Sequence, residues 1–202
     1  SRGKIEQSKL SMNIENTLNL GKNILEANRI PNPYLDSEIL LSESINKDKK
    51  HIILNLKKIL SRKQLDIFNS LIERRKKGEP IAYLTNKKEF WKDEFFVNKG
   101  VLIPRPDTEL IIEQVLKIYS KEAKLQVLDI GTGSGCILLS ILKERPNFYG
   151  TGIDISKKSI NVCKFNANKL DLINRTKFIH SSIDNFRIGK YDVVVSNPPY
   201  ID

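Results

Sequence analysis

Residues 127–136 read Val-Leu-Asp-Ile-Gly-Thr-Gly-Ser-Gly-Cys, a short apolar run that leads into three glycines at alternate positions. This pattern predicts a buried strand, a tight turn and the start of a helix, because glycine adopts backbone conformations that other residues avoid. A helix that starts in this way offers free backbone N–H groups to a ligand. A dinucleotide fingerprint would need glycine at Cys136, and a phosphate loop would need Gly-Lys-Ser/Thr, so neither motif is present.

Two acidic residues accompany the glycine loop. Asp154 ends the next predicted strand, where it can hold a ribose diol through two hydrogen bonds or, alternatively, cap the following helix. Asp129, just before the loop, would face the cationic half of a ligand, the sulfonium or the amino group, or tie down the loop's own backbone, or do both. S-Adenosyl-L-methionine carries a ribose and a sulfonium but no phosphate, so it is the cofactor that this combination favours.

Around the loop, strand-like and helix-like segments alternate. Helices are predicted at 136–144 and 156–169, and strands at 127–129, 149–154, 177–180 and 191–196. Alternation at this spacing indicates an α/β fold with a parallel sheet and right-handed crossovers. Four strands are fewer than a doubly wound domain normally contains, so we expect residues 105–202 to form a Rossmann-like domain that is incomplete at its C-terminus.

The first part of the chain predicts helices only. Apolar residues recur at helical spacing up to about residue 78, and Ser61 to Gln64 has the spacing of a capping box. Gly78 and Pro80 should end the last of these helices. We therefore expect residues 1–84 to form a small helical bundle.

A different pattern occupies residues 85–104. Short apolar runs at 89–91, 95–97 and 101–103 are separated by turn residues, which predicts a β-hairpin connector. Asp107 is then placed to N-cap a further helix.

The composition limits the classes of protein to which the chain can belong. The chain has 202 residues, 40% of them hydrophobic and 29% charged, and no apolar run approaches the length of a membrane span. Its net charge of +10 suits nucleic acid or an acidic partner, or simply a solvated helix face. Cys136, Cys163 and the two histidines lack metal-ligand spacing. We expect a metal-free cytoplasmic protein with two structural thiols.

Five stretches occur in the order found in the HemK/PrmC family, which the chain resembles over nearly its whole length. The most family-specific stretch is 101–109, Val-Leu-Ile-Pro-Arg-Pro-Asp-Thr-Glu, whose Arg-Pro-Asp-Thr-Glu run is not shared with other methyltransferases. It follows residues 78–85 and 89–91 and precedes 129–135 and Asn-Pro-Pro-Tyr at 197–200. The chain departs from the family at Asn86, where glycine is usual. It also departs at Ser182-Ile183, where an acid and a bulky apolar residue normally lie near the adenine.

This resemblance implies an enzyme that methylates the side-chain amide of the glutamine in the Gly-Gly-Gln motif of peptide chain release factors. It implies a helical substrate-binding domain, a donor-binding methyltransferase domain, and no membrane or direct nucleic-acid partner. The expected donor-binding residues are Asp129, Gly131, Thr132, Gly133, Ser134, Gly135, Asp154, Ile183 and Asn197. The expected substrate-binding residues are Asn197, Pro198, Pro199, Tyr200, Phe90 and Arg105.

Asn197 and Pro198 are the expected catalytic residues. An amide nitrogen is a poor nucleophile, so its orientation matters: the Asn197 side-chain oxygen and the Pro198 carbonyl can accept its two hydrogens. Pro198 favours extended geometry at Asn197, which projects it from the end of the strand. Tyr200 or Phe90 would pack against the flat amide. Catalysis would then consist mainly of alignment and electrostatics, without a metal ion.

Two alternatives remain. Asn-Pro-Pro-Tyr serves the exocyclic amine of adenine equally well, which with the positive charge favours a methyltransferase of DNA or RNA. The early end of the predicted sheet instead favours a catalytically incomplete fragment.

Overall fold

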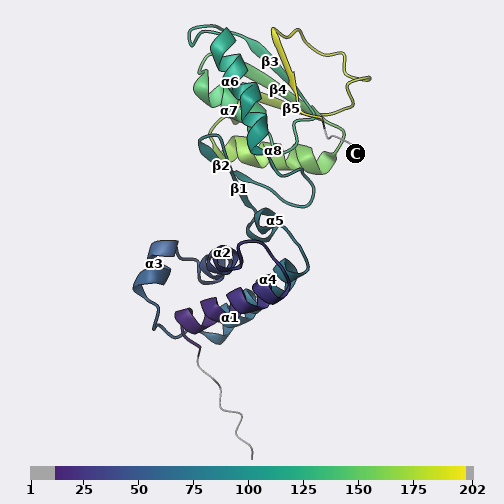
Figure 1. Ribbon diagram of the computed structural model, residues 1–202. Coiled ribbons are helices and arrows are strands. Elements are labelled where there is room, and N and C mark those ends of the chain that lie inside the picture. Colours follow the sequence, from purple (N-terminus) through teal and green to yellow (C-terminus); the bar gives the residue numbers. More distant parts are fainter. Residues whose placement is uncertain (1–11, 199–202) are drawn as a thin grey trace, which may run out of the picture. The chain divides into compact units, whose positions relative to one another are not determined.

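The computed structural model describes residues 12–198, in two compact units that divide between Thr85 and Asn86 (Figure 1). The first unit is helical, and the second combines a small hairpin with a parallel sheet and its helices.

Within residues 12–85 the structure consists of helices, as predicted. Asn13, Asp48 and Ser61 cap their helices with side-chain oxygens, and Ser61 forms the predicted capping box with Gln64. Gly21 lets the helices approach closely, because a Cβ there would lie 2.3 Å from the hydroxyl of Ser37. The helices are α1 (Ile14–Ala27), α2 (Pro33–Ile45), α3 (Lys49–Leu54), α4 (Arg62–Lys76) and α5 (Ile81–Thr85).

The second unit begins with an antiparallel hairpin of β1 (Lys87–Phe90) and β2 (Asp93–Phe96). Asn86 has a φ of 57° and donates from Nδ2 to the carbonyl of Val97 at 3.0 Å. Asparagine tolerates the left-handed region better than most other residues with side chains, so it suits this position.

Two predictions between the hairpin and the next helix are wrong. Residues 101–103 form no strand. Val101 is buried, which explains its apolar character, and Pro104, the next residue after this run, lacks the backbone N–H that a strand ladder requires. Asp107 is not an N-cap. It lies inside a 3₁₀ turn, η1 (Pro106–Thr108), which precedes α6 (Glu109–Ile118).

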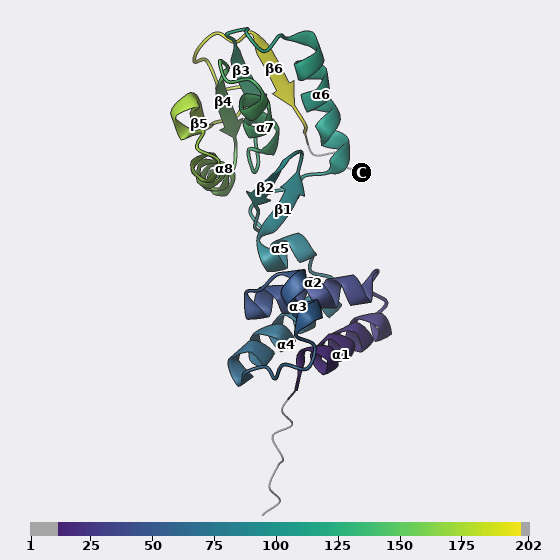
Figure 2. The same cartoon turned by 90° about the vertical axis from the view of Figure 1, so that its left-hand side faces the viewer.

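The predicted parallel sheet is confirmed. Its strands are β3 (Gln126–Ile130), β4 (Tyr149–Asp154), β5 (Thr176–His180) and β6 (Val193–Ser196), in the order β5-β4-β3-β6. Figure 2 shows β6 beside β3, with which it pairs in parallel. The crossovers contain α7 (Cys136–Glu144), α8 (Lys157–Lys169) and a short η2 (Ile173–Arg175). This is a Rossmann-like arrangement, in which ligands bind at the carboxyl ends of the strands.

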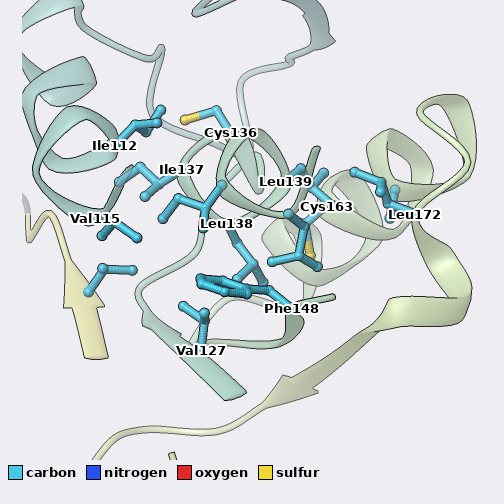
Figure 3. Close-up of a cluster of buried hydrophobic side chains, with 14 of the residues drawn as sticks. Ile112, Val115, Val127, Cys136, Ile137, Leu138, Leu139, Phe148, Cys163 and Leu172 are labelled. Atoms are coloured by element: carbon cyan, nitrogen blue, oxygen red, sulfur yellow. The ribbon is translucent and has the colours of Figure 1, made fainter. Parts of the chain in front are cut away.

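One apolar core joins α6, α7 and α8 to a single face of the sheet (Figure 3). Val127 of β3 faces this core, whereas its neighbour Leu128 faces the other side and packs with Phe186. Cys136 and Cys163 lie in the same core, free and buried, which confirms their interpretation as structural thiols. No helix within residues 12–198 is long and apolar enough to cross a membrane.

Candidate functional site

The glycine loop connects β3 to α7 at the carboxyl edge of the sheet. Gly131, Gly133 and Gly135 have φ values of 71°, 56° and 82°, in the region that glycine adopts most readily. The N–H groups of Gly131 and Thr132 donate to the carbonyl of Ile153 in β4 at 2.9 and 3.0 Å. The loop is therefore fixed by the neighbouring strand without help from a ligand.

Asp154 joins this loop to the next helix. Its Oδ2 accepts the N–H of Gly133 at 3.0 Å, and its Oδ1 accepts the N–H of Ser156 at 2.8 Å. The side chain that caps α8 is Ser156, so the alternative of Asp154 as the helix cap is wrong. A carboxylate has about four acceptor positions, and two backbone bonds leave capacity for hydroxyl groups.

Asp129 lies beneath the loop with a relative exposure of 1%. Its Oδ2 accepts the hydroxyl of Thr132 at 2.8 Å, so it holds the loop through a side chain and not, as the alternative role predicted, through the loop's backbone. Its buried Oδ1 has no hydrogen-bond partner among the described residues. Burial, aided by the negative charge of Asp154, raises the pKa of Asp129 to about 7, against the opposing effect of the Thr132 hydroxyl. A buried acceptor of this kind is satisfied by a donor or a cation.

Asn197 follows β6 at the same edge. Ser196 is paired with Ile130, the last residue of β3, and its hydroxyl donates to the Ile130 carbonyl at 3.0 Å. Asn197 therefore lies next to the start of the glycine loop at Gly131. The amide Nδ2 of Asn197 donates to the Thr108 hydroxyl at 3.0 Å.

A cavity of about 390 Å³ opens beside Asn197. Its wall combines apolar side chains from the segment around α6 with polar groups of the Arg-Pro-Asp-Thr-Glu run and of the end of β6. The lining residues are Leu102, Arg105, Asp107, Thr108, Leu110, Ile111, Asn197 and Pro198. The cavity offers a half-apolar space with an amide group at its edge, which suits a flat polar side chain.

The run at 105–109 has two structural roles that sequence analysis missed. Thr108 binds the Asn197 amide, and the Glu109 carboxylate accepts the backbone N–H of Trp91, in the hairpin turn, at 2.7 Å. The run thus connects the hairpin to the cavity. The only signal in the sequence was that this run is the most family-specific one.

Asn166 was also missed, although it supports the glycine loop. It is fully buried on α8, where its Nδ2 donates to the carbonyls of Ser134 at 2.8 Å and Phe96 at 2.9 Å. Its Oδ1 accepts the N–H of Phe96 at 2.7 Å. One side chain therefore holds the glycine loop and β2 together. Nothing distinguishes it in the sequence from the other asparagines of the helix.

The remaining predicted site residues fall into three groups. Arg105 and Pro198 are exposed at the cavity, and Ile183 is 46% exposed just after β5. Phe90 is only 3% exposed and packs edge-on against Phe95 in the core, with ring centroids 6.1 Å apart. This burial argues against the prediction that Phe90 packs on a substrate amide. Pro199 and Tyr200 lie outside the described residues.

The chemical groups of the site are carboxylates, amides, hydroxyls and backbone N–H groups. Within the described part of the chain, no cluster of three or more His, Cys, Asp or Glu residues could hold a metal ion. The arrangement provides one ready-made loop for a ligand with hydroxyl groups and positive charge, and an adjacent cavity for a flat amide or amine.

Comparison with known proteins finds similarity in both units. Residues 16–85 match the family described as PrmC N-terminal domain, and residues 121–200 match a methyltransferase domain. A release factor glutamine methyltransferase of Caulobacter vibrioides is 39% identical over 85% of this chain and 60% of that protein. One from Buchnera aphidicola is 40% identical over 89% of this chain and 64% of that protein.

A longer relative is the bifunctional methyltransferase of Rickettsia bellii, 39% identical over 95% of this chain and 39% of that protein. Among solved structures, an SAM-dependent methyltransferase from Thiobacillus denitrificans is 30% identical over 46% of this chain and 36% of that chain, with a TM-score of 0.39. The chain thus spans between about two fifths and two thirds of the curated relatives named here.

Proposed function

We propose that this chain methylates the side-chain amide nitrogen of a glutamine in a protein substrate, because residues 16–85 match the PrmC N-terminal domain and residues 121–200 match a methyltransferase domain. The substrate is a peptide chain release factor, and the glutamine is that of its Gly-Gly-Gln motif. The names of the relatives from Caulobacter and Buchnera support this choice of substrate.

The observation that carries the proposal is the pairing of β6 with β3. Because Ser196 lies opposite Ile130, Asn197 follows directly beside the glycine loop. A donor held by the loop and an amide held by Asn197 would therefore meet at one edge of the sheet. Bringing two reactants together in fixed orientation is a large part of what an enzyme can contribute to such a transfer.

The residues of the loop fit S-adenosyl-L-methionine, which supplies the methyl group. Asp154 lies where it can accept the ribose hydroxyls, since its two backbone bonds leave acceptor positions. Asp129 carries a buried carboxylate oxygen that lacks a partner among the described residues, and a positively charged ligand would satisfy it. In this proposal Ile183, whose side chain is exposed, covers the adenine.

The protein's catalytic contribution is to align the acceptor. The Asn197 Oδ1 and the carbonyl of Pro198 accept the two hydrogens of the substrate amide, which fixes the direction of its nitrogen lone pair. The apolar lining of the cavity, from Leu102, Leu110 and Ile111, holds the flat amide away from water. Both acceptors stabilise the positive charge that develops on the nitrogen.

The helical residues 1–84 form the substrate-binding domain in this proposal. Exposed basic side chains lie on or just after α4, including Lys63 and Lys77, and suit an acidic surface of the release factor. A substrate that acts in translation places the enzyme in the cytoplasm.

A second candidate is transfer to the exocyclic amine of adenine in DNA or RNA. It is favoured by the net charge of +10 and by the similar geometry of a planar –NH₂ group. The match of residues 16–85 to the PrmC N-terminal domain favours the protein substrate instead.

An assay with radiolabelled donor distinguishes the protein substrate from the nucleic-acid substrate. The whole protein is incubated with a release factor and, in parallel, with adenine-containing DNA and RNA, and incorporated label is counted for each. We expect label in the release factor and none in nucleic acid, with an Asn197→Ala variant as the inactive control. Label in nucleic acid alone would favour the second candidate, and label in none would indicate a catalytically incomplete chain.

A further inference from the structure

The hydroxyl of Thr108 contacts the side chain on which the proposed alignment depends. We propose that Thr108 is a positioning residue, whose hydrogen bond to Asn197 Nδ2 turns the Asn197 Oδ1 toward the acceptor amide. This rests on the proposed function, because it explains how the acceptor is oriented. Thr108 acts on the acceptor through Asn197.

The geometry supports a directional contact. The Nδ2 atom of Asn197 lies 3.0 Å from the Thr108 hydroxyl oxygen, a normal hydrogen-bond length. Thr108 is 6% exposed, so little water competes for its hydroxyl. The nitrogen and oxygen of a planar amide point in different directions from its carbon, on opposite sides of the Cβ–Cγ bond. With the nitrogen bound to Thr108, the oxygen of Asn197 faces away from Thr108.

Helix capping does not account for this hydroxyl. Thr108 lies directly before α6, where a threonine usually caps the helix by accepting a backbone N–H with its side chain. Here its backbone is already helical, with φ −67° and ψ −20°, and the side chain makes no capping bond. The preceding turn is closed by the backbone, through the N–H of Thr108 and the carbonyl of Arg105 at 3.1 Å. The hydroxyl is therefore available for Asn197.

The orientation matters because the two ends of the asparagine amide have nearly the same shape but opposite hydrogen-bonding roles. An Asn197 with its NH₂ group toward the cavity would meet the NH₂ group of the substrate, and both groups are donors. Thr108 and Asn197 line the same cavity, so the contact lies where the acceptor would enter. The effect is expected on turnover rather than on donor binding, because the contact lies on the acceptor side.

The test compares Thr108→Val, which keeps the shape but removes the acceptor, with Thr108→Ser, which keeps the hydroxyl. In the whole protein, Thr108→Val should lower kcat on release factor about tenfold, the factor expected for one lost hydrogen bond. Thr108→Ser should stay within about threefold of the parent, and the donor Kd should change less than about twofold in both. Thr151→Val, an equally buried threonine within β4, is the matched control and should leave kcat unchanged.

A second readout needs no substrate. The side-chain NH₂ signals of Asn197 are assigned by NMR through their loss in Asn197→Ala. In Thr108→Val these protons should exchange with water faster and shift, whereas Thr108→Ser should leave them close to the parent. Unchanged Asn197 signals in Thr108→Val, or an equal loss of kcat in Thr108→Val and Thr108→Ser, would overturn the proposal. Failure of the parent protein to methylate release factor would contradict the proposed function, while the NMR comparison would still decide the role of Thr108.

Discussion

The two halves of the candidate site are built differently. The glycine loop is held by bonds between residues close in the chain, Thr132 to Asp129 at a separation of 3 and Gly133 to Asp154 at 21. Asn197 is held by Thr108, 89 residues away. The donor half is therefore fixed mainly within one βαβ unit, with Asn166 of the next helix as a further support, whereas the acceptor half exists only after distant segments have come together. We therefore expect the two halves to respond to mutation independently. A mutation that damages the acceptor half should preserve donor binding.

The largest expected effect is that of Asn197→Ala. Turnover on release factor should fall on the order of 100-fold or more, since the variant loses one of the two acceptors that align the substrate amide. Donor affinity should stay within a few-fold, because the glycine loop is fixed by β4. Initial rates and calorimetric titration of the donor measure the two quantities on the same preparation. A parallel loss of turnover and of donor affinity would show that the two halves of the site do not act independently.

Asn166→Leu tests the support of the donor half. Removing this buried amide leaves the backbone groups of Phe96 and the carbonyl of Ser134 without their partner, which should lower the free energy of unfolding by about 2–4 kcal/mol. Asn168→Leu on the exposed face of α8 is the matched control and should change it by less than about 0.5 kcal/mol. Denaturant unfolding measures both. Equal stabilities for the two variants would contradict the role given to Asn166.

Asp154→Ala should weaken donor binding by about 1–3 kcal/mol, through lost bonds to the ribose and a loosened Gly133. Asp66→Ala on the exposed surface of α4 removes the same charge elsewhere and should leave donor affinity unchanged. Calorimetry with S-adenosyl-L-methionine compares them. An Asp154→Ala variant with the parent's affinity would remove Asp154 from the proposed donor site.

The smallest expected effect is a pH dependence that arises at Asp129. With its pKa at about 7, this carboxyl is mostly neutral at pH 6 and ionised at pH 8. A cationic donor prefers the ionised form, so its affinity should rise about tenfold between these pH values. Asp129→Asn should flatten this dependence. A parent protein with the same donor affinity at pH 6 and pH 8 would show that Asp129 does not face the positive charge.

The same raised pKa has a consequence for folding. The folded protein binds a proton at Asp129 more tightly than the unfolded chain does, so this group favours folding at low pH. Its contribution should be lost as the pH rises from about 4 through about 7. Thermal unfolding of the parent and of Asp129→Asn across this range isolates the contribution of Asp129, and a constant difference between them would contradict it.

Sequence patterns were most informative where structure is local. The strand at 149–154 and the helix at 136–144 were predicted with the bounds that the structure has, because periodicity and glycine placement determine such elements. Residues 101–103 were predicted wrongly as a strand, because an apolar run reports burial and does not identify a pairing partner. The Ser61 capping box is confirmed, whereas the cap predicted at Asp107 gave way to a 3₁₀ turn.

The residues of the candidate site also differ in how well the sequence reveals them, according to how far away in the chain their partners lie. Gly131–Gly135 and Asp154 could be recognised because their bonds connect neighbouring segments of one βαβ unit. The roles of Thr108, Glu109 and Asn166 could not be recognised, since their partners are distant in the chain and only folding brings them together. Phe90 shows the converse: an aromatic residue in one of the stretches that resemble the family is buried in the core, where its side chain contributes to packing.

The proposed function is tested most directly by locating the transferred methyl group. The whole protein is given donor with a trideuterated methyl and an intact release factor, and the product is fragmented and sequenced by tandem mass spectrometry. The account predicts the label on the side-chain amide nitrogen of the Gly-Gly-Gln glutamine, and its loss in Asn197→Ala. A label on any other residue, with that glutamine unmodified, would contradict the assignment of the Asn197 cavity to a glutamine amide.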